Sequence, residues 1–394
     1  MVALLTAVRK KLAGSVGIRG LMALLAYQAR RCLPRESMAI SRLQVAAPKR
    51  LHPMFEEVRD KASVPRLAFI GSSTEPDARY FCAAAEALGI QFEILDPLAS
   101  NFMAKFDRSG ADLFLVRPMT YSSLEREIYE EIYDYLGSGL SRKVLPLPQE
   151  MKIYESKRRQ FYLLRAKNIS RPTTFLEFSE ASAMRRAEEL GFPVIFKSSL
   201  GSGGSSVQIL TSAAQARRHF RRLFRGKYYS SSLYDPRDFD YGYALIQKFY
   251  EDVREYRVIK IGESWFGHEK LAGSNGILLS GSGKNSWNVP GMELFDFCRE
   301  IAEDNGFRWM AFDVLVDREG NHYLNELQTW FGSVKDSQMY LEGVPGRYVF
   351  RDGNFVFEKG EFNVLGGMCL RIADAVAWWE NGGALDGQEL ENAL

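Results

Sequence analysis

Residues 194–210 read VIFKSSLGSGGSSVQIL, and this stretch decides the fold. A short apolar strand ends in Lys197, and eight of the next nine residues, 198–206, are Gly or Ser before a second apolar strand begins at Val207. Glycines let backbone N–H groups approach phosphate oxygens, serine hydroxyls add donors, and a lysine supplies positive charge. The pattern predicts a loop that closes over phosphates, although a plain linker between two strands would have the same composition.

Three better-known phosphate motifs do not fit. A Walker A loop reads GxxxxGK[ST], but the similar segment at 280–286 has Leu278 in place of the first Gly and Asn285 after the lysine. A dinucleotide-binding turn would need Gly at the position of Ser206. In a protein kinase the lysine follows the glycine loop and an HRD motif is present, whereas Lys197 precedes the loop and the chain has no HRD.

A second signal is an acidic hairpin further along the chain. MAFDVLV (310–316) and HYLNEL (322–327) read as two strands joined by a tight turn, so Asp313 and Glu326 can face each other. Glu326 and Gln328 are two residues apart and project to the same face of their strand. Two carboxylates and an amide oxygen are hard ligands that suit Mg²⁺. Solvent-exposed acids on a strand are the simpler explanation of the same pattern.

A third signal lies between these two. The strand ALIQKFY (244–250) ends in polar and aromatic residues and can present backbone groups to an adenine edge. Glu255 suits ribose hydroxyls, and Arg257 carries a forked guanidinium that suits phosphate. A charged edge strand would explain these residues equally well. We expect this strand, EYRVIKI (255–261) and SWFGHEKL (264–271) to be antiparallel.

The order of these features resembles the ATP-grasp superfamily, specifically the branch of glutathione synthetase, D-alanine ligase and the glutamate-adding ligases. Lys157 precedes Lys197 by 40 residues, the glycine loop follows at once, QKFY comes 50 residues after Lys197, and the acidic hairpin closes the region. The resemblance covers about 65–335, with a motif-bearing core at 151–332. It implies an α/β (α+β) chain with the ATP-grasp fold, a small parallel α/β domain before it and an N-terminal helical arm.

The resemblance also implies which residues bind ATP. Lys157 and Lys197 match two lysines that contact the nucleotide phosphates, and Glu255 matches the acid that binds ribose. The glycine loop that closes over the phosphates matches Gly201, Ser202, Gly203, Gly204 and Ser205. The segment that hydrogen-bonds adenine matches Gln247, Lys248, Phe249 and Tyr250.

Catalytic and metal-binding positions are implied in the same way. Arg257 and Lys270 match basic residues that face the phosphates and the reaction centre. Asp313, Glu326 and Gln328 match a site for two Mg²⁺ ions, in which Mn²⁺ can substitute. The last position is usually Asn in the family. Gln328 carries its amide oxygen one methylene further out, which leaves the geometry of the second ion open.

Changes of pattern divide the chain into four parts. From residue 65 the short buried strands RLAFIG, FEILD and DLFLVR alternate with helices, which predicts a small parallel sheet. We expect helices at 77–88, 122–136, about 155–167 and 179–190, the last starting on Ser179 as its cap. The parts are a basic helical arm (1–60), a pre-ATP-grasp domain (61–150), the ATP-grasp domain (151–340) and a C-terminal extension (341–394). In the extension we expect a hairpin at 348–357 and a helix that packs on the core with Cys369, Ile372, Val376 and Trp379.

Charge is distributed unevenly over the 394 residues. The net charge is only +2, which gives no reason to expect a nucleic-acid partner. Residues 1–50 hold ten basic residues and one acid, a net +9, so the rest of the chain carries −7. A basic amphipathic arm can lie on an anionic membrane surface, dock on a protein partner or fold back on its own domain.

Cysteine, histidine and hydrophobic patterns narrow the class of protein. The four cysteines are far apart and the four histidines show no metal-ligand spacing, so structural zinc is not expected. The longest uncharged stretch near the N-terminus, 20–29, is far shorter than the roughly 20 residues that a spanning helix needs. We therefore expect a cytoplasmic protein with free thiols.

The resemblance implies an ATP-dependent carboxylate–amine ligase. A carboxylate would attack the γ-phosphorus to give an acyl-phosphate and ADP, and an amine would then displace phosphate. Small molecules and peptides are both candidate substrates, and a homodimer is expected from the resemblance. Two alternatives stay open: an ATP-grasp kinase acting on a hydroxyl acceptor, and a non-catalytic nucleotide-binding scaffold at a membrane surface.

Overall fold

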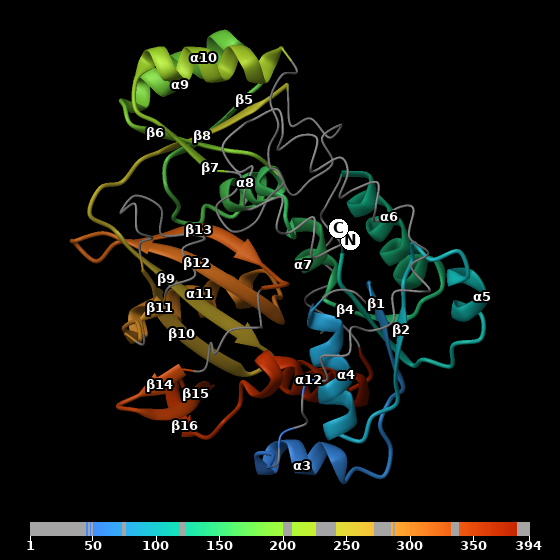
Figure 1. Cartoon of the computed structure of the whole chain (residues 1–394). Coiled ribbons are helices and arrows are strands. Elements are labelled where there is room, and N and C mark those ends of the chain that lie inside the picture. Colours follow the sequence, from blue (N-terminus) through green and yellow to red (C-terminus); the bar gives the residue numbers. More distant parts are fainter. Residues whose placement is uncertain are drawn as a thin grey trace, which may run out of the picture.

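The computed structural model describes residues 45, 48, 50–72, 76–118, 123–199, 207–225, 242–271, 285–286, 288–331 and 339–383. Over these residues the strands form three sheets, which Figure 1 shows with their covering helices. Most of the basic arm and the whole glycine loop, Gly201 to Ser205, lie outside the described residues. The way the three sheets meet is what positions the candidate site.

The first sheet has four parallel strands in the order β2-β1-β3-β4. Their bounds are Leu67–Ile70 (β1), Phe92–Leu95 (β2), Leu113–Val116 (β3) and Lys143–Leu145 (β4). Every residue of β1 and β3 is buried, as expected for central parallel strands that are covered on both faces. The predicted parallel sheet and its first three strands are confirmed.

Five helices connect these strands or flank them in the described part of the chain. They are α3 (Pro53–Arg59), α4 (Pro76–Ala87), α5 (Phe102–Phe106), α6 (Ser123–Asp134) and α7 (Pro148–Ile153). The helix expected at 77–88 is confirmed by α4. The helix expected at 122–136 is shorter, because α-helical geometry ends at Asp134 and the chain continues as a π-helical turn, Tyr135–Gly139.

The second sheet is small and antiparallel, in the order β5-β8-β6-β7. Its strands are Thr174–Glu177 (β5), Val194–Lys197 (β6), Val207–Leu210 (β7) and Ala244–Lys248 (β8), and its helices are α9 (Glu180–Leu190) and α10 (Ala213–Phe224). Figure 1 shows both helices on the same face of the sheet, where Phe196, Phe220 and Ile246 form a shared core. The two strands predicted on either side of the glycine loop are confirmed.

The strand predicted at 244–250 differs from expectation. It ends at Lys248 and pairs with β5 and β6, so it does not join the strands at 254–270. Ala244 and Ile246 are fully buried in the core that the small sheet shares with α9 and α10. Packing against those helices therefore decides which sheet this strand joins, and a strand pattern alone does not carry that information.

The third sheet is the largest, with the order β13-β12-β9-β10-β15-β14, β11 added to β10 and β16 to β15. Its first strands are Arg254–Ile261 (β9), Ser264–Lys270 (β10), Asn285–Ser286 (β11), Trp309–Val316 (β12) and His322–Gln328 (β13). The helices α8 (Lys157–Ala166) and α11 (Met292–Asp304) pack beside it. Asp313 pairs directly with Glu326 between β12 and β13, which confirms the register expected for the acidic hairpin.

The C-terminal segment extends the third sheet. β14 is Met339–Leu341, β15 Val344–Arg351 and β16 Asn354–Lys359, and they are followed by a short 3₁₀ turn at Val364–Gly367 and by α12, Met368–Glu380. β15 and β16 form the hairpin predicted at 348–357, and β15 joins β10 through Trp265 and Tyr348. The domain boundary predicted at 340/341 falls inside β14. On α12, Cys369, Ile372 and Val376 are fully buried, while Trp379 is half-buried.

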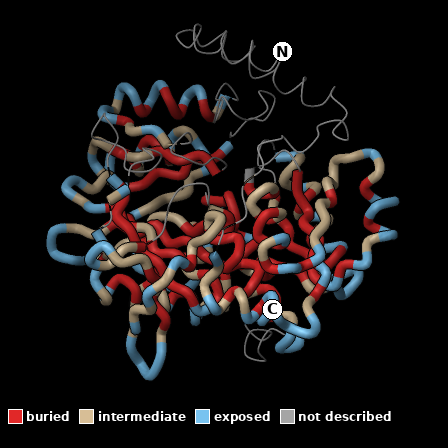
Figure 2. The backbone as a smooth tube through the Cα atoms, turned by 60° about the horizontal axis from the view of Figure 1, so that its bottom comes forward, coloured by how far each residue is buried: buried red, intermediate tan, exposed pale blue. Residues whose placement is uncertain are grey.

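A buried arginine joins α12 to the first and third sheets. The Arg371 guanidinium lies over the rings of Trp309 (4.8 Å), Trp330 (4.7 Å) and Phe331 (4.5 Å) and donates to the Thr329 carbonyl at 2.9 Å. The Trp330 indole donates to the carbonyl of Val116, at the end of β3, at 2.9 Å. Figure 2 shows buried chain through the middle of the molecule and exposed chain along its outer helices and loops. The junction fixes the large sheet against the first sheet.

The cap of α9 offers a first test of the fold. Ser179 lies in extended geometry before the helix, and its hydroxyl accepts a hydrogen bond from the Ser182 N–H at 3.1 Å, as predicted. Ser179→Ala is expected to lower the free energy of unfolding by about 1 kcal/mol, because one N–H of the first turn loses its partner. Urea unfolding measures the change. Ser179→Asp should keep the cap, so an equal loss in both variants would contradict this explanation.

Among the residues that the structure describes, none of the helices is long and apolar enough to cross a membrane.

Candidate functional site

A pocket lies where the small sheet meets α8 and β13. Its cavity volume is small, about 30 Å³, and the pocket is partly open to solvent. Its polar lining includes Lys157, Gln160, Lys197, Gln247 and Asn325, and its apolar lining includes Phe161, Leu164, Pro172, Leu245 and Leu324. An apolar cavity with a few converging polar groups is the usual form of a small-molecule site. Three of these polar residues, Lys157, Lys197 and Gln247, are ones that the sequence assigns to ATP.

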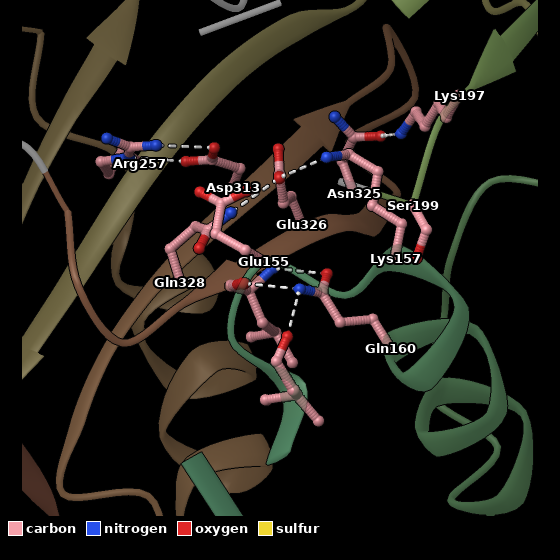
Figure 3. A network of polar contacts seen from close by, with 12 residues as sticks. Glu155, Lys157, Gln160, Lys197, Ser199, Arg257, Asp313, Asn325, Glu326 and Gln328 are labelled. Carbon is pink, nitrogen blue, oxygen red and sulfur yellow. Dashed lines mark hydrogen bonds and ion pairs between the residues drawn. The ribbon is translucent and has the colours of Figure 1, made fainter. Parts of the chain in front are cut away.

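Lys157 links the pocket to the acidic hairpin. It begins α8, and its backbone N–H donates to the Ser199 carbonyl at 3.2 Å, which ties the helix to the start of the glycine loop. Its ammonium lies 3.3 Å from a Glu326 carboxylate oxygen, and the Gln328 amide donates to the same oxygen at 2.8 Å. Figure 3 shows these side chains pointing toward one another. The first residue of α8 thus contacts both Ser199 and the Glu326 carboxylate of β13.

Lys197 is held from the other side of the pocket. It ends β6, is 6% exposed, and donates to the Asn325 side-chain oxygen at 2.8 Å. Gln247, on the adjacent strand β8, donates to the same oxygen at 3.2 Å. Figure 3 shows the Lys197 contact beside Lys157 and Glu326. The two predicted phosphate-binding lysines therefore approach the same pair of neighbouring residues on β13.

A second group of charges lies on β9, β10 and β12. Arg257 forms two parallel hydrogen bonds with Asp313, at 2.7 and 2.8 Å. The Lys270 ammonium donates to Asp313 as well and to Glu255 at 2.8 Å. Arg257 pairs with Asp313 across β9 and β12, and Lys270 pairs with Glu255 across β9 and β10, so the four side chains share one face of the sheet. The cluster reaches Glu326 because Glu326 is the strand partner of Asp313.

Burial and neighbouring charges set the protonation of these groups. Burial raises the pKa of Glu255, although Lys270 opposes the rise. Burial would also raise the pKa of Asp313, but Arg257 and Lys270 hold it well below its usual range. The Lys197 pKa falls to about 8 because burial disfavours its charge more than Glu326 favours it. Burial would raise the pKa of Glu326, but Lys157 and Lys197 lower it, so the carboxylates Asp313 and Glu326 are ionised at neutral pH.

The combined cluster has a positive surplus. It contains four cations (Lys157, Lys197, Arg257 and Lys270) and three carboxylates (Glu255, Asp313 and Glu326), which leaves one excess positive charge. Buried charges are stable only when they are paired, so the arrangement favours an anionic ligand. A polyphosphate together with a divalent cation would satisfy both kinds of charge.

The donor set of Asp313, Glu326 and Gln328 fits a hard cation such as Mg²⁺. The two carboxylates face each other in register, and the Gln328 side-chain oxygen is buried with no hydrogen-bond partner among the described residues. A buried acceptor of this kind is rare unless a ligand, water or ion completes it. The described residues contain no group of three or more His, Cys, Asp or Glu that could hold a metal, so any site here depends on the Gln328 amide and on phosphate oxygens.

Some of the residues predicted to bind adenine or ribose do not line the pocket. Glu255 bonds to Lys270 in the charged cluster and is not among the residues that line the pocket. Lys248 is exposed, with its ammonium 5.3 Å from the centre of the Tyr250 ring, which packs on Tyr323 at 5.1 Å. Phe249 is half-buried between them in the chain. The adenine and ribose roles of these residues stay predictions, and Gly201 to Ser205 lie outside the described residues.

Two residues at the site were not predicted from the sequence. Asn325 touches both Lys197 and Gln247, although the motif pattern singled out only its neighbours. His268 pairs with Arg257 across β9 and β10, is 4% exposed, and its pKa falls to about 3 because of burial and the charges of Arg257 and Lys270. Side chains alternate between the two faces of a strand. His268, two residues from Lys270, is therefore expected on the same face as Lys270, and Asn325, next to Glu326, on the face opposite to Glu326.

Comparison by sequence gives only a weak match to a known protein. No protein-family profile matches the chain. An alignment of 157 positions, which covers 35% of the chain, is 24% identical to the carbamoyl phosphate synthase large chain of Methanoregula boonei and spans only 15% of that protein.

Several solved structures match most of the chain. A RimK domain ATP-grasp protein from Sphaerobacter thermophilus matches with a TM-score of 0.50 and 15% identity, over 79% of this chain and 99% of that one. Biotin carboxylase from Campylobacter jejuni, in its β-γ-ATP complex, matches with a TM-score of 0.52 and 13% identity, over 83% and 73%. The ATP-grasp ligase PsnB, complexed with a minimal precursor, matches with a TM-score of 0.50 and 14% identity, over 79% and 100%.

These matches establish the fold of the chain. Structural similarity at 13 to 15% sequence identity shows a common architecture and does not show a shared reaction. The chain has the ATP-grasp fold, as the order of its motifs predicts.

Proposed function

We propose that the chain is an ATP-dependent ligase that joins a carboxylate to an amine through an acyl-phosphate. The observation that supports this most is the convergence of Lys157 and Lys197 on β13, beside the paired carboxylates Asp313 and Glu326 and the cations Arg257 and Lys270. The pocket beside Lys197 and Gln247 takes the nucleoside, and Lys157 and Lys197 hold its phosphates. Small-molecule and peptide carboxylates and amines both belong to the proposed substrate class.

The proposed reaction has two chemical steps. A substrate carboxylate oxygen attacks the γ-phosphorus, so a new O–P bond forms while the bond between that phosphorus and ADP breaks. The amine nitrogen then attacks the acyl carbon, the C–O bond to phosphate breaks, and the amine loses a proton. Arg257 and Lys270 stabilise the negative charge that moves between carboxylate and phosphate. Such transfers depend on positioning and charge stabilisation more than on covalent help from the protein.

Magnesium would be held by Asp313, Glu326 and Gln328. When bound, it would supply charge neutralisation to the β- and γ-phosphates. We propose two ions, with Mn²⁺ as a substitute. Before nucleotide binds, the lysines and the arginine neutralise Asp313 and Glu326, so a divalent cation and phosphate would enter the site together as a balanced set.

The test is an ADP-release assay with MgATP and pools of carboxylates and amines, followed by a labelling experiment on the pair that turns over. With an ¹⁸O-labelled carboxylate, a ligase transfers one ¹⁸O atom to the released phosphate. A kinase would instead leave a stable phosphorylated product and need no amine. Phosphate without label, or turnover that ignores the amine, would overturn the ligase proposal.

The pH dependence of nucleotide binding tests the role of Lys197. Its pKa is lowered to about 8 by burial, so its charge is lost at lower pH than for an ordinary lysine. Affinity for MgADP should therefore be constant from pH 7 to about 8 and fall roughly tenfold per pH unit above that. Calorimetric titration at a series of pH values measures this. Lys197→Arg should give a flat profile because arginine stays charged, and the same fall in both proteins would contradict the assignment.

A further inference from the structure

Asn325 occupies a position between the two halves of the site. It lies on β13 of the large sheet and lines the pocket, and its side-chain oxygen accepts hydrogen bonds from Lys197 on β6 and Gln247 on β8 of the small sheet. A single amide oxygen therefore connects the two sheets across the pocket. Its neighbour Glu326 receives the other lysine, Lys157, at 3.3 Å.

The charge of the acceptor decides how firmly Lys197 is held. Among the charged neighbours of Lys197, the Glu326 carboxylate has the strongest influence on it. A lysine bonded to a carboxylate is held by a charge-assisted hydrogen bond, which is about twice as strong as a bond to a neutral oxygen. The neutral Asn325 amide therefore orients the Lys197 ammonium but binds it more weakly than a carboxylate would. The ammonium can then move to a phosphate more easily when nucleotide binds. It also leaves Glu326 with one lysine instead of two.

We infer that Asn325 is a positioning residue for the nucleotide site: its amide oxygen keeps Lys197 and Gln247 in place across the pocket and apart from Glu326 until phosphate takes over the lysine. The inference rests on the proposed nucleotide-binding function. Asn325 would influence the nucleotide through Lys197, whereas the effect of a residue that only fills space would not depend on the lysine.

The experiment measures MgADP affinity by calorimetry in a double-mutant cycle. Asn325→Leu removes the acceptor oxygen with little change in volume, and Lys197→Met removes the donor charge. Asn325→Leu is expected to weaken MgADP binding about tenfold in the wild-type background. In the Lys197→Met background the same substitution should change affinity by less than in wild type, because only the contact with Gln247 is then lost.

Matched controls keep the result interpretable. Asn288 donates to Glu269 of β10 at 2.8 Å and neither residue lines the pocket, so Asn288→Leu breaks a hydrogen bond of the same length away from the pocket and should leave affinity unchanged. Thermal unfolding without nucleotide checks that each variant folds, and Asn325→Ala provides a smaller side chain that also lacks the acceptor.

The outcomes separate this inference from the proposed function. If wild-type protein binds MgADP and Asn325→Leu and Asn325→Ala bind equally well, the positioning role is wrong and the nucleotide site stands. Additive losses from Asn325→Leu and Lys197→Met also overturn the role, because they show that Asn325 acts independently of the lysine. If wild-type protein does not bind MgADP at all, the proposed function fails and this inference fails with it.

Discussion

Glu326→Gln is expected to lower turnover by more than about 100-fold, since even partners outside the metal shell contribute 10- to 100-fold at such sites. Glu326 is the residue at which Lys157, Gln328 and the strand partner Asp313 meet. An amide keeps the size of the side chain but removes the charge that would hold Mg²⁺ and offset the lysines. The loss should appear in the ADP-release assay with the carboxylate and amine that support wild-type turnover.

The direction in which ADP affinity changes, with and without Mg²⁺, distinguishes a lost metal ligand from general damage to the site. With Mg²⁺, ADP should bind Glu326→Gln more weakly than wild type, because a metal ligand is lost. With EDTA, ADP should bind the variant at least as tightly as wild type, because a carboxylate that repels phosphate is gone. Weaker binding under both conditions would indicate general damage to the site. Glu319→Gln, in the exposed turn of the same hairpin, should match wild type in both.

The acidic hairpin shows what the sequence can predict well. A tight turn between two apolar strands places Asp313 and Glu326 near the same level of the hairpin, but a register shift between Asp313 and Val314 makes them direct partners, and the sequence does not show that shift. The strands around the glycine loop and the parallel strands of the first sheet are similar cases, because their hydrophobic runs are short and bounded by turn residues. Local periodicity is enough in each of them.

Contacts between distant segments could not be read in this way. Lys157 is on α8, and its place in one site with Glu326, 169 positions later in the chain, was expected only from the resemblance to a family. The sheet that β8 joins depends on packing against α9 and α10, and the helices α10 and α11 were not predicted at all. Asn325 carries no charge and was assigned no role in the acidic hairpin that contains it, so its place between Lys197 and Gln247 emerges only when two sheets are assembled.

In the charged cluster on β9, β10 and β12, each buried carboxylate is paired with a cation from a neighbouring strand. Asp313 is 1% exposed and is contacted by both Arg257 and Lys270, while Glu255 shares Lys270. Removing water from one such carboxylate is unfavourable unless each oxygen is paired. In the proposed reaction, fixed cations at this place would need no reorganisation when a phosphoryl group is transferred. Under that proposal, the positive environment is present before substrate enters.

Arg257→Lys is expected to lower turnover about 10²-fold while changing MgADP affinity less than about threefold, the pattern of an interaction that matters most during phosphoryl transfer. The two parallel hydrogen bonds from Arg257 to Asp313, at 2.7 and 2.8 Å, need a planar fork that an ammonium does not offer. Lys270 still pairs Asp313 in the variant, so the charge of the cluster is kept and only its geometry changes.

The same strand supplies the matched control. Arg254 makes an equivalent pair of hydrogen bonds to Glu269, at 2.7 and 2.8 Å, but its side chain is 55% exposed and lies away from the cluster. Arg254→Lys should keep wild-type turnover, because exposed ion pairs contribute little. Equal losses in both variants would show that the strand and not the reaction centre is sensitive. A fall in MgADP affinity as large as the fall in turnover would place Arg257 in ground-state binding and contradict its proposed role in the transfer step.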